Sequence, residues 1–236
     1  MVTHPRPDRS RPDRSRAPGS HRPRRSPGGW WRSCVVGWGL AVSLVANAGA
    51  AELINRGPSE SDSQLMARVL GASAELAQDV VHSTDIAAGK MTVIGFVLGE
   101  DSTLIGHLLV EQSPGRFQHV EFPTACDEEG GAPKLEAVFF ARTVKGGGRD
   151  LGILCSWEAQ HAIVNGTLYA ASFYRLAETG DRLAVEPVTN LNKDKRFTTS
   201  DLTHRDQRGN WVNGPKPTFT TVAGVKKLLK KMGIEQ

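Results

Sequence analysis

The chain has 236 residues, of which 39% are hydrophobic and 23% are charged, a composition typical of globular proteins. Its formal net charge of +4 comes from the N-terminus, because residues 1–50 contain nine arginines and two aspartates, leaving 20 basic and 23 acidic side chains in the other 186 residues. The main part of the chain is therefore slightly acidic, which is not typical of nucleic-acid-binding domains. We expect no nucleic-acid partner.

The first 50 residues have the composition of a leader. Residues 1–32 are basic, rich in Pro and Ser, and have no apolar pattern, so we expect them to be disordered. This basic stretch is long for a signal peptide, and a start codon assigned too far upstream is the alternative. Residues 33–50 contain an apolar run of 13 residues, Ser33–Val45, followed by small residues. This order is typical of a secretory signal peptide.

The same residues predict where the mature protein is found. We expect cleavage near Ala48 or Ala50, which would release a periplasmic or extracellular protein that meets the membrane only during export. An uncleaved membrane anchor is the alternative, but the apolar run is shorter than the roughly 20 residues of a spanning helix. We therefore interpret the chain as a bacterial-type envelope protein.

Cleavage would remove Cys34 and leave two cysteines, Cys126 and Cys155. An even number of cysteines in an exported chain is typical of a disulfide-bonded protein. We predict a bridge between these two residues. By closing a loop of about 30 residues it would stabilise the fold by about 3 to 4 kcal/mol.

The segment Ile153–Leu176 predicts a β-hairpin around which the rest of the domain is interpreted. Asn165 and Gly166 are typical of a two-residue type I′ turn, and they are flanked by β-branched and aromatic residues. A turn at this point would pair Trp157 with Tyr174. One face of the hairpin would then be almost entirely apolar and would need a helix or a second sheet layer to cover it, whereas the other face would be mixed.

The rest of the chain predicts an α+β fold in a single exported domain, residues 62–236. Helical spacing of apolar residues indicates an N-terminal helix over 62–82 and a short C-terminal helix that begins at Thr220 or Thr221. The polar segment 188–217 is predicted as a long surface loop. We expect one antiparallel meander of about six to eight strands, covered by the N-terminal helix, and its further strands are 91–98, 103–111, 116–122, 135–144 and 182–186.

No motif in the sequence indicates a cofactor or a metal. The glycines of Lys145–Arg149 lead into a predicted strand, whereas a phosphate loop needs a helix at that point. The acidic residues Asp127–Glu129 lack the alternating ligands of a calcium loop. We expect neither a cofactor nor a metal, and the sequence assigns no catalytic residue.

Two functional hypotheses follow. The first is a non-catalytic binding or accessory module that holds an envelope protein or a glycan on the mixed face of the hairpin, because aromatic and arginine side chains give most binding energy at interfaces. Its candidate residues are Tyr169, Phe173, Arg175 and Glu158. The alternative is a periplasmic hydrolase whose active site is assembled from distant loops, with His161 or His204 beside a carboxylate. The sequence has no nucleophile motif, which favours the first hypothesis.

Overall fold

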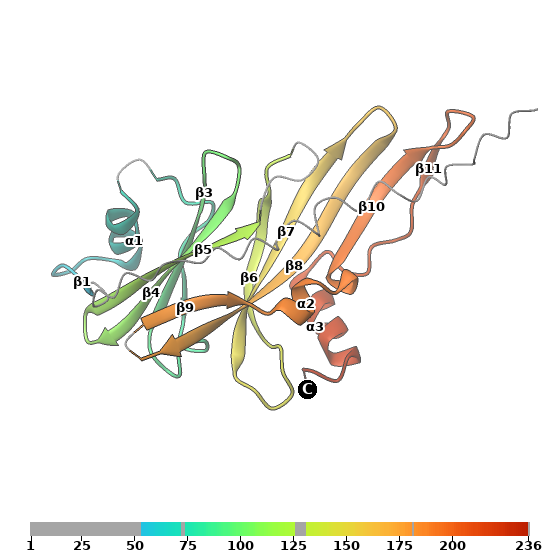
Figure 1. Cartoon of the computed structure of the whole chain (residues 1–236). Helices are drawn as coiled ribbons and strands as arrows, with labels where there is room; N and C mark the ends of the chain where they lie inside the picture. The colour runs from blue at the N-terminus through green and yellow to red at the C-terminus, as the bar shows by residue number, and fades with distance from the viewer. Residues whose placement is uncertain (1–52, 72–73, 126–130, 181, 236) are drawn as a thin grey trace, which may run out of the picture. The chain divides into compact units, whose positions relative to one another are not determined.

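The computed structural model describes residues 53–71, 74–125, 131–180 and 182–235 (Figure 1). All of them belong to one compact unit, Val42–Gln236, and the other unit, Met1–Ala41, lies outside the described residues. The predicted leader and signal peptide, residues 1–50, therefore lie outside the described part of the chain. No helix in that part is long and apolar enough to cross a membrane.

The described residues are rich in antiparallel β-sheet, as expected, but they form two sheets rather than one. The first sheet contains the predicted meander, with Gly115 at φ 73° in the turn between its second and third strands. Its strand order is β1-β5-β4-β3-β2. The bounds of these strands are β1 Leu53–Asn55, β2 Val81–Ser83, β3 Thr92–Leu98, β4 Leu104–Ser113 and β5 Arg116–Ala125.

The second sheet contains the predicted hairpin and has the strand order β11-β10-β8-β7-β6, with β9 also paired to β8. β10 and β11 lie where we predicted a long surface loop. That prediction was wrong because β10 has few apolar residues, and it is backbone pairing to β8 that holds it in the sheet. The bounds are β6 Lys134–Arg142, β7 Arg149–Gln160, β8 Val164–Thr179, β9 Arg182–Pro187, β10 Thr198–Arg205 and β11 Trp211–Asn213.

The hairpin is present, but its turn is not at Asn165-Gly166. The chain reverses between His161 and Val164, whose backbones hydrogen bond in both directions. Trp157 consequently pairs with Leu168, six positions from the expected partner, Tyr174. Because six is an even number, the side chains that remain within the two strands keep their expected face, whereas His161 and Ile163 lie in the turn.

The two sheets pack against each other through the apolar hairpin face. This face carries Trp157 and Tyr174, which are buried together with Phe96 and Phe122 of the first sheet. The rings of Phe122 and Tyr174 lie 5.1 Å apart, and the Tyr174 hydroxyl donates to the carbonyl of Thr124 at 2.7 Å. The second sheet layer that this face required is thus the β1–β5 sheet.

The outer face of the first sheet packs against α1 (Asp62–Leu70). Ser61 caps this helix in a capping box with Gln64, and the buried Leu65 and Met66 lie against the sheet. The helix was predicted to reach residue 82, but it ends at Gly71, which has φ 91°. After that glycine the chain extends along the sheet edge, where Leu76 forms a bridge with Val97.

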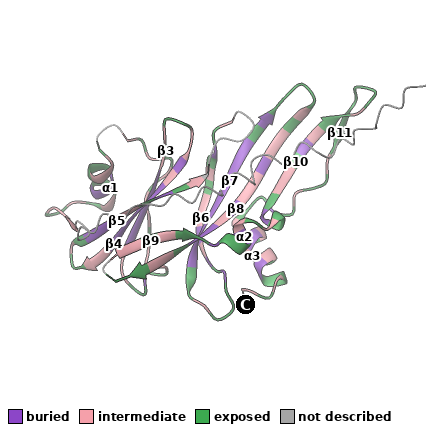
Figure 2. Ribbon diagram, in the orientation of Figure 1, coloured by how far each residue is buried: buried purple, intermediate pink, exposed green. Residues whose placement is uncertain are grey.

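The outer face of the second sheet packs against three short helices, α2 (Thr189–Asn192), η2 (Lys195–Phe197) and α3 (Val222–Lys231). α3 confirms the predicted C-terminal helix, with Thr221 as its N-cap and Gly233 at φ 72° after its end. Figure 2 shows that buried residues run along the strands of both sheets. Each sheet therefore has apolar side chains on both faces, a pattern that a single meander does not require.

Candidate functional site

The mixed face of the hairpin, on which we placed the binding residues, is the face that the three short helices cover. Phe173 is 0% exposed, and its ring makes edge contacts with Phe139 and Phe197, with centroids 6.0 and 5.0 Å away. Tyr169 is half-buried against the same cluster. Phe173 is therefore a core residue, and it does not meet a ligand at the surface.

Arg175 is half exposed but held in an ion pair. Its Nε and Nη2 donate to the two carboxylate oxygens of Asp150 at 2.9 and 2.8 Å, and Nη2 also donates to Thr143 Oγ1 at 2.9 Å. The hydrogen bonds that Arg175 donates to Asp150 raise the pKa of Arg175. Since the Asp150 side chain is only 6% exposed, Arg175 is the cation that compensates a buried carboxylate. Glu158, on β7, is exposed and accepts from Gln160 at 3.2 Å.

The two histidines of the hydrolase hypothesis lie at the same end of the second sheet, both next to Val164. His161 lies in the β7–β8 turn, and His204 lies on β10 opposite Val164 and Val212. Asp201 precedes His204 by three residues on one strand, so the two side chains point to opposite faces. Asp201 and His204 therefore do not form an acid–base pair.

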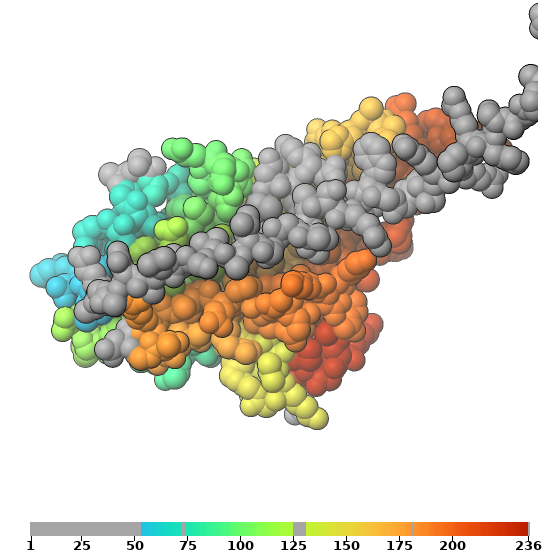
Figure 3. Space-filling model, viewed as in Figure 1, coloured from blue at the N-terminus to red at the C-terminus, as the bar shows by residue number. Residues whose placement is uncertain are grey.

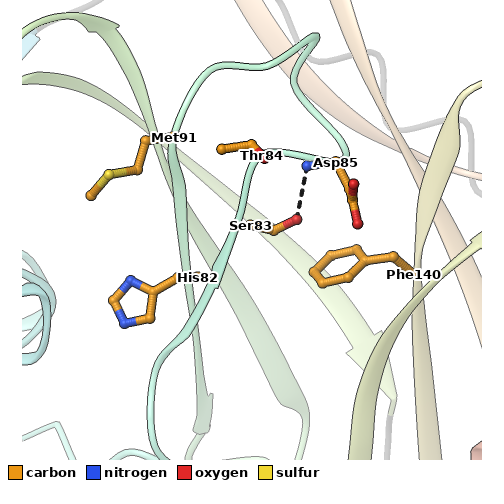
Figure 4. Close-up of a pocket in the computed structure, with 6 residues that line it drawn as sticks. All are labelled: His82, Ser83, Thr84, Asp85, Met91 and Phe140. Atoms are coloured by element: carbon orange, nitrogen blue, oxygen red, sulfur yellow. Dashed lines mark hydrogen bonds between the residues drawn. The ribbon is translucent and has the colours of Figure 1, made fainter.

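A shallow, open cavity of about 410 Å³ lies where β2 approaches β6 (Figure 4). His82 lines it, and its Nδ1 lies 2.6 Å from Oδ2 of Asp62, which also binds Arg56. The hydroxyl nearest in sequence, Ser83 Oγ, points away from His82 and accepts from the backbone of Asp85 at 2.9 Å. In the described part of the chain, no hydrogen bond joins His82 to a hydroxyl, so the cavity lacks the nucleophile–base contact of a hydrolase.

A pair of histidines, His107 and His119, lies on the outer face of the first sheet. Nδ1 of His107 is 3.0 Å from Nε2 of His119, and the two rings are stacked with an interplanar angle of 14°. Burial lowers the pKa of both rings; His119 lowers that of His107 further, while Glu121 opposes the effect in both. Over the described residues no three His, Cys, Asp or Glu side chains are arranged to hold a metal ion.

Cys155 lies on the buried face of β7, and burial raises the pKa of its thiol to about 12. It carries a free thiol in the described structure. Its expected partner, Cys126, lies outside the described residues. The Cys126–Cys155 bridge therefore stays a prediction.

The end of the second sheet at β11 and the β7–β8 turn is coloured red-orange and yellow in Figure 3. It exposes apolar side chains next to an arginine. Ile163 and Trp211 are 64 and 47% exposed, whereas Val212 pairs with His204 and points to the opposite face of the sheet. The guanidinium carbon of Arg205 lies 5.1 Å from the centroid of the Trp211 ring, and the Arg205 backbone donates to Ile163 at 3.0 Å. We call Ile163, Arg205 and Trp211 the Trp211 surface.

The Trp211 surface was missed because we predicted a long surface loop over residues 188–217, which include Trp211. The signal that would have located it is the turn before it. Oδ1 of Asp206 accepts from the backbones of Arg208 and Asn210 at 2.8 and 2.9 Å, and Gly209 has φ 82°. Asp and Gly at these positions are typical of a tight hairpin, which places Trp211 on an edge strand opposite Arg205.

No protein-family model matches the chain, and the comparisons with curated proteins and with solved structures gave no significant match.

Proposed function

We propose that the chain is an exported, non-catalytic module that binds a protein partner through the Trp211 surface. The observation that carries this proposal is the half-exposed indole of Trp211 with the guanidinium of Arg205 stacked on it. Tryptophan and arginine are the side chains most enriched among residues that dominate binding energy. The sequence predicted binding residues on the hairpin face, which is covered. The proposal instead assigns binding to residues at the end of the second sheet.

The chemistry of the Trp211 surface favours a partner with an apolar side chain and a carboxylate. Ile163 supplies aliphatic surface next to Arg205, whose backbone N–H donates to the Ile163 carbonyl. Within the described residues Arg205 has no ion-pair partner, and the nearby Asp206 uses its carboxylate to close its own turn. Arg205 therefore keeps a planar set of donors that can bind a carboxylate in a bidentate manner.

The location belongs to the proposal as well. We propose that residues 33–50 direct export, that cleavage near Ala48 or Ala50 releases the protein into the periplasm or the medium, and that Cys126 and Cys155 then form a bridge. These steps are supported by the order of basic, apolar and small residues and by the even number of cysteines that remains. A hydrolase has less support, because the Asp62–His82 pair lacks a hydroxyl partner among the described residues.

The test replaces Trp211 and Arg205 by Ala, one at a time, and measures recovery of partner proteins from an envelope extract. Because both side chains are exposed, we expect each variant to melt within a few degrees of the wild type. Loss of a dominant interface side chain weakens binding by about 2 kcal/mol or more, or about 30-fold. Lys230→Ala, on the exposed face of α3, is the control and should retain binding. Undiminished recovery by both variants would contradict the proposal.

A further inference from the structure

Charge is distributed unevenly along the chain after the leader. Residues 51–188 contain 10 basic and 19 acidic side chains, a formal charge of −9, whereas residues 189–236 contain 10 basic and 4 acidic side chains, a formal charge of +6. Seven of the ten lysines lie in the second segment. This segment supplies α2, η2 and α3, which cover the outer face of the second sheet. The layer over that face is therefore made by the basic part of the chain.

The densest basic group in this layer lies on α3, which is red in Figure 3. Four lysines at positions i, i+1, i+4 and i+5 share one face of the helix. We call them the α3 lysines; they are Lys226, Lys227, Lys230 and Lys231. The first is half-buried and the other three are exposed. The apolar face of α3 carries Val225 and Leu229, which are 0% exposed and pack in the cluster of Phe139. The core therefore fixes the helix from which the lysines project.

The described carboxylates do not compensate the α3 lysines, none of which has an ion-pair partner among the described residues. Asp194 pairs with Arg196 at 2.5 Å, Glu136 of the neighbouring β6 pairs with Lys134 at 3.0 Å, and Glu235 is half-buried. At 1.5 Å per residue, the four lysines span about 8 Å of the helix axis, which is less than the Debye length of about 10 Å at 0.1 M salt. Their charges therefore act together on a partner.

We infer that the α3 lysines bind the surface of a bilayer that contains anionic lipid. Each lysine near such a surface strengthens binding by roughly fivefold, and the attraction extends over about one Debye length. The same surface repels the acidic remainder of the chain, so the uneven charge orients the molecule with α3 towards the lipid. Because Val225 and Leu229 belong to the core, the attachment is electrostatic and the helix does not insert. This contact would persist after export, whereas the sequence led us to expect membrane contact only during export.

The chemistry of the α3 lysines favours a bilayer over other polyanions. Lysine is depleted in protein–protein interfaces, where arginine and aromatic side chains supply most binding energy. Single-stranded nucleic acids are bound through aromatic side chains on which bases stack, and α3 contains none. Lysines are flexible point charges, which suit a fluid layer of headgroups better than one fixed geometry. α3 packs against β6, at the opposite end of the second sheet from β11, and the inference does not rest on the proposed function.

The test measures how fast an amine-reactive reagent labels each lysine of the full-length chain, using mass spectrometry, with and without lipid vesicles. The leader does not interfere with this measurement, because residues 1–50 contain no lysine. Vesicles of equal parts phosphatidylcholine and phosphatidylglycerol should slow labelling of the α3 lysines severalfold, while Lys90 of the first sheet keeps its rate. Vesicles of phosphatidylcholine alone should give no protection. High salt should remove the protection, since it screens the attraction.

A charge-reversal variant then assigns the protection to α3. Lys227→Glu combined with Lys230→Glu changes two exposed side chains, and we expect the variant to melt within a few degrees of the wild type. Loss of two lysines weakens binding by roughly 25-fold, and the new carboxylates weaken it further. The remaining Lys226 and Lys231 should therefore be labelled equally fast with and without the anionic vesicles.

The matched control is Arg116→Glu combined with Arg208→Glu. It changes the net charge by the same amount at exposed positions outside α3, so protection of the α3 lysines should remain. The inference would be overturned if anionic vesicles left labelling of the wild-type α3 lysines unchanged, or if neutral vesicles protected them equally. Loss of protection in the control to the same extent as in the α3 variant would also overturn it, as would protection by a nucleic acid without protection by vesicles.

Discussion

At the scale of single residues, side-chain alternation predicted which face each residue occupies but not what covers that face. Trp157 and Tyr174 lie on the buried face, as expected. Phe173 and Arg175 also lie on their expected face, yet Phe173 is core because η2 and α3 cover it. Arg175 compensates Asp150, a contact between β7 and β8 that the sequence pattern does not reveal.

The stacked histidines give the structure a dependence on pH. Burial lowers the pKa of His107 and His119, so the folded protein favours the neutral rings, while the unfolded chain titrates near the ordinary value of about 6.5. As the pH falls below about 6.5, the unfolded chain takes up protons that the folded chain does not, and the free energy of unfolding decreases. We expect the melting temperature to fall between about pH 7.5 and 5.5.

His119→Gln tests whether the stacked histidines cause this fall in melting temperature. It removes one titrating ring and keeps a side chain that can hydrogen bond to His107. The loss of melting temperature on acidification should be smaller in this variant than in the wild type. Equal losses in the two proteins would show that other groups cause the dependence.

At the scale of elements, Asn165-Gly166 shows why a strong local signal predicted the wrong turn. Gly166 lies within β8 at φ 138°, and a Cβ atom there would lie 2.0 Å from the carbonyl oxygen of Asp201. The glycine therefore allows β10 to approach β8, a tertiary contact between residues far apart in sequence. The helix α1 likewise ends earlier than its local pattern predicts. Leu76, which follows Gly71, forms a bridge with Val97 at the sheet edge and does not extend the helix.

Replacing Gly166 by Ala tests the role of this close approach. The added methyl group would collide with backbone and would be strained at this φ, so we expect a loss of about 2 to 4 kcal/mol in the free energy of unfolding. Chemical denaturation measures the loss. Gly148→Ala is the control, because no atom lies within 4 Å of its added Cβ. An unchanged midpoint for Gly166→Ala would contradict the β8–β10 contact.

At the scale of the whole molecule, composition and alternation predicted a fold rich in antiparallel sheet, and most strand positions in the first two thirds of the described chain were found. They did not predict two sheets. That division arises because Val93 and Leu109 point to α1 while Ile94 and Leu108 point to the second sheet, so the same strands have two apolar faces. The Trp211 surface could not be predicted either, since exposure at a sheet end depends on what the other elements leave uncovered.

The measurement that tests the proposed binding function most directly is photo-crosslinking in the cells that produce the protein. A photoreactive phenylalanine analogue replaces Trp211, and, in a separate control, Lys230 on α3. We expect a discrete protein adduct from position 211 that is absent from position 230, because only the first lies in the Trp211 surface. The proposal would be contradicted if position 211 gave no adduct, or if both positions gave the same adducts.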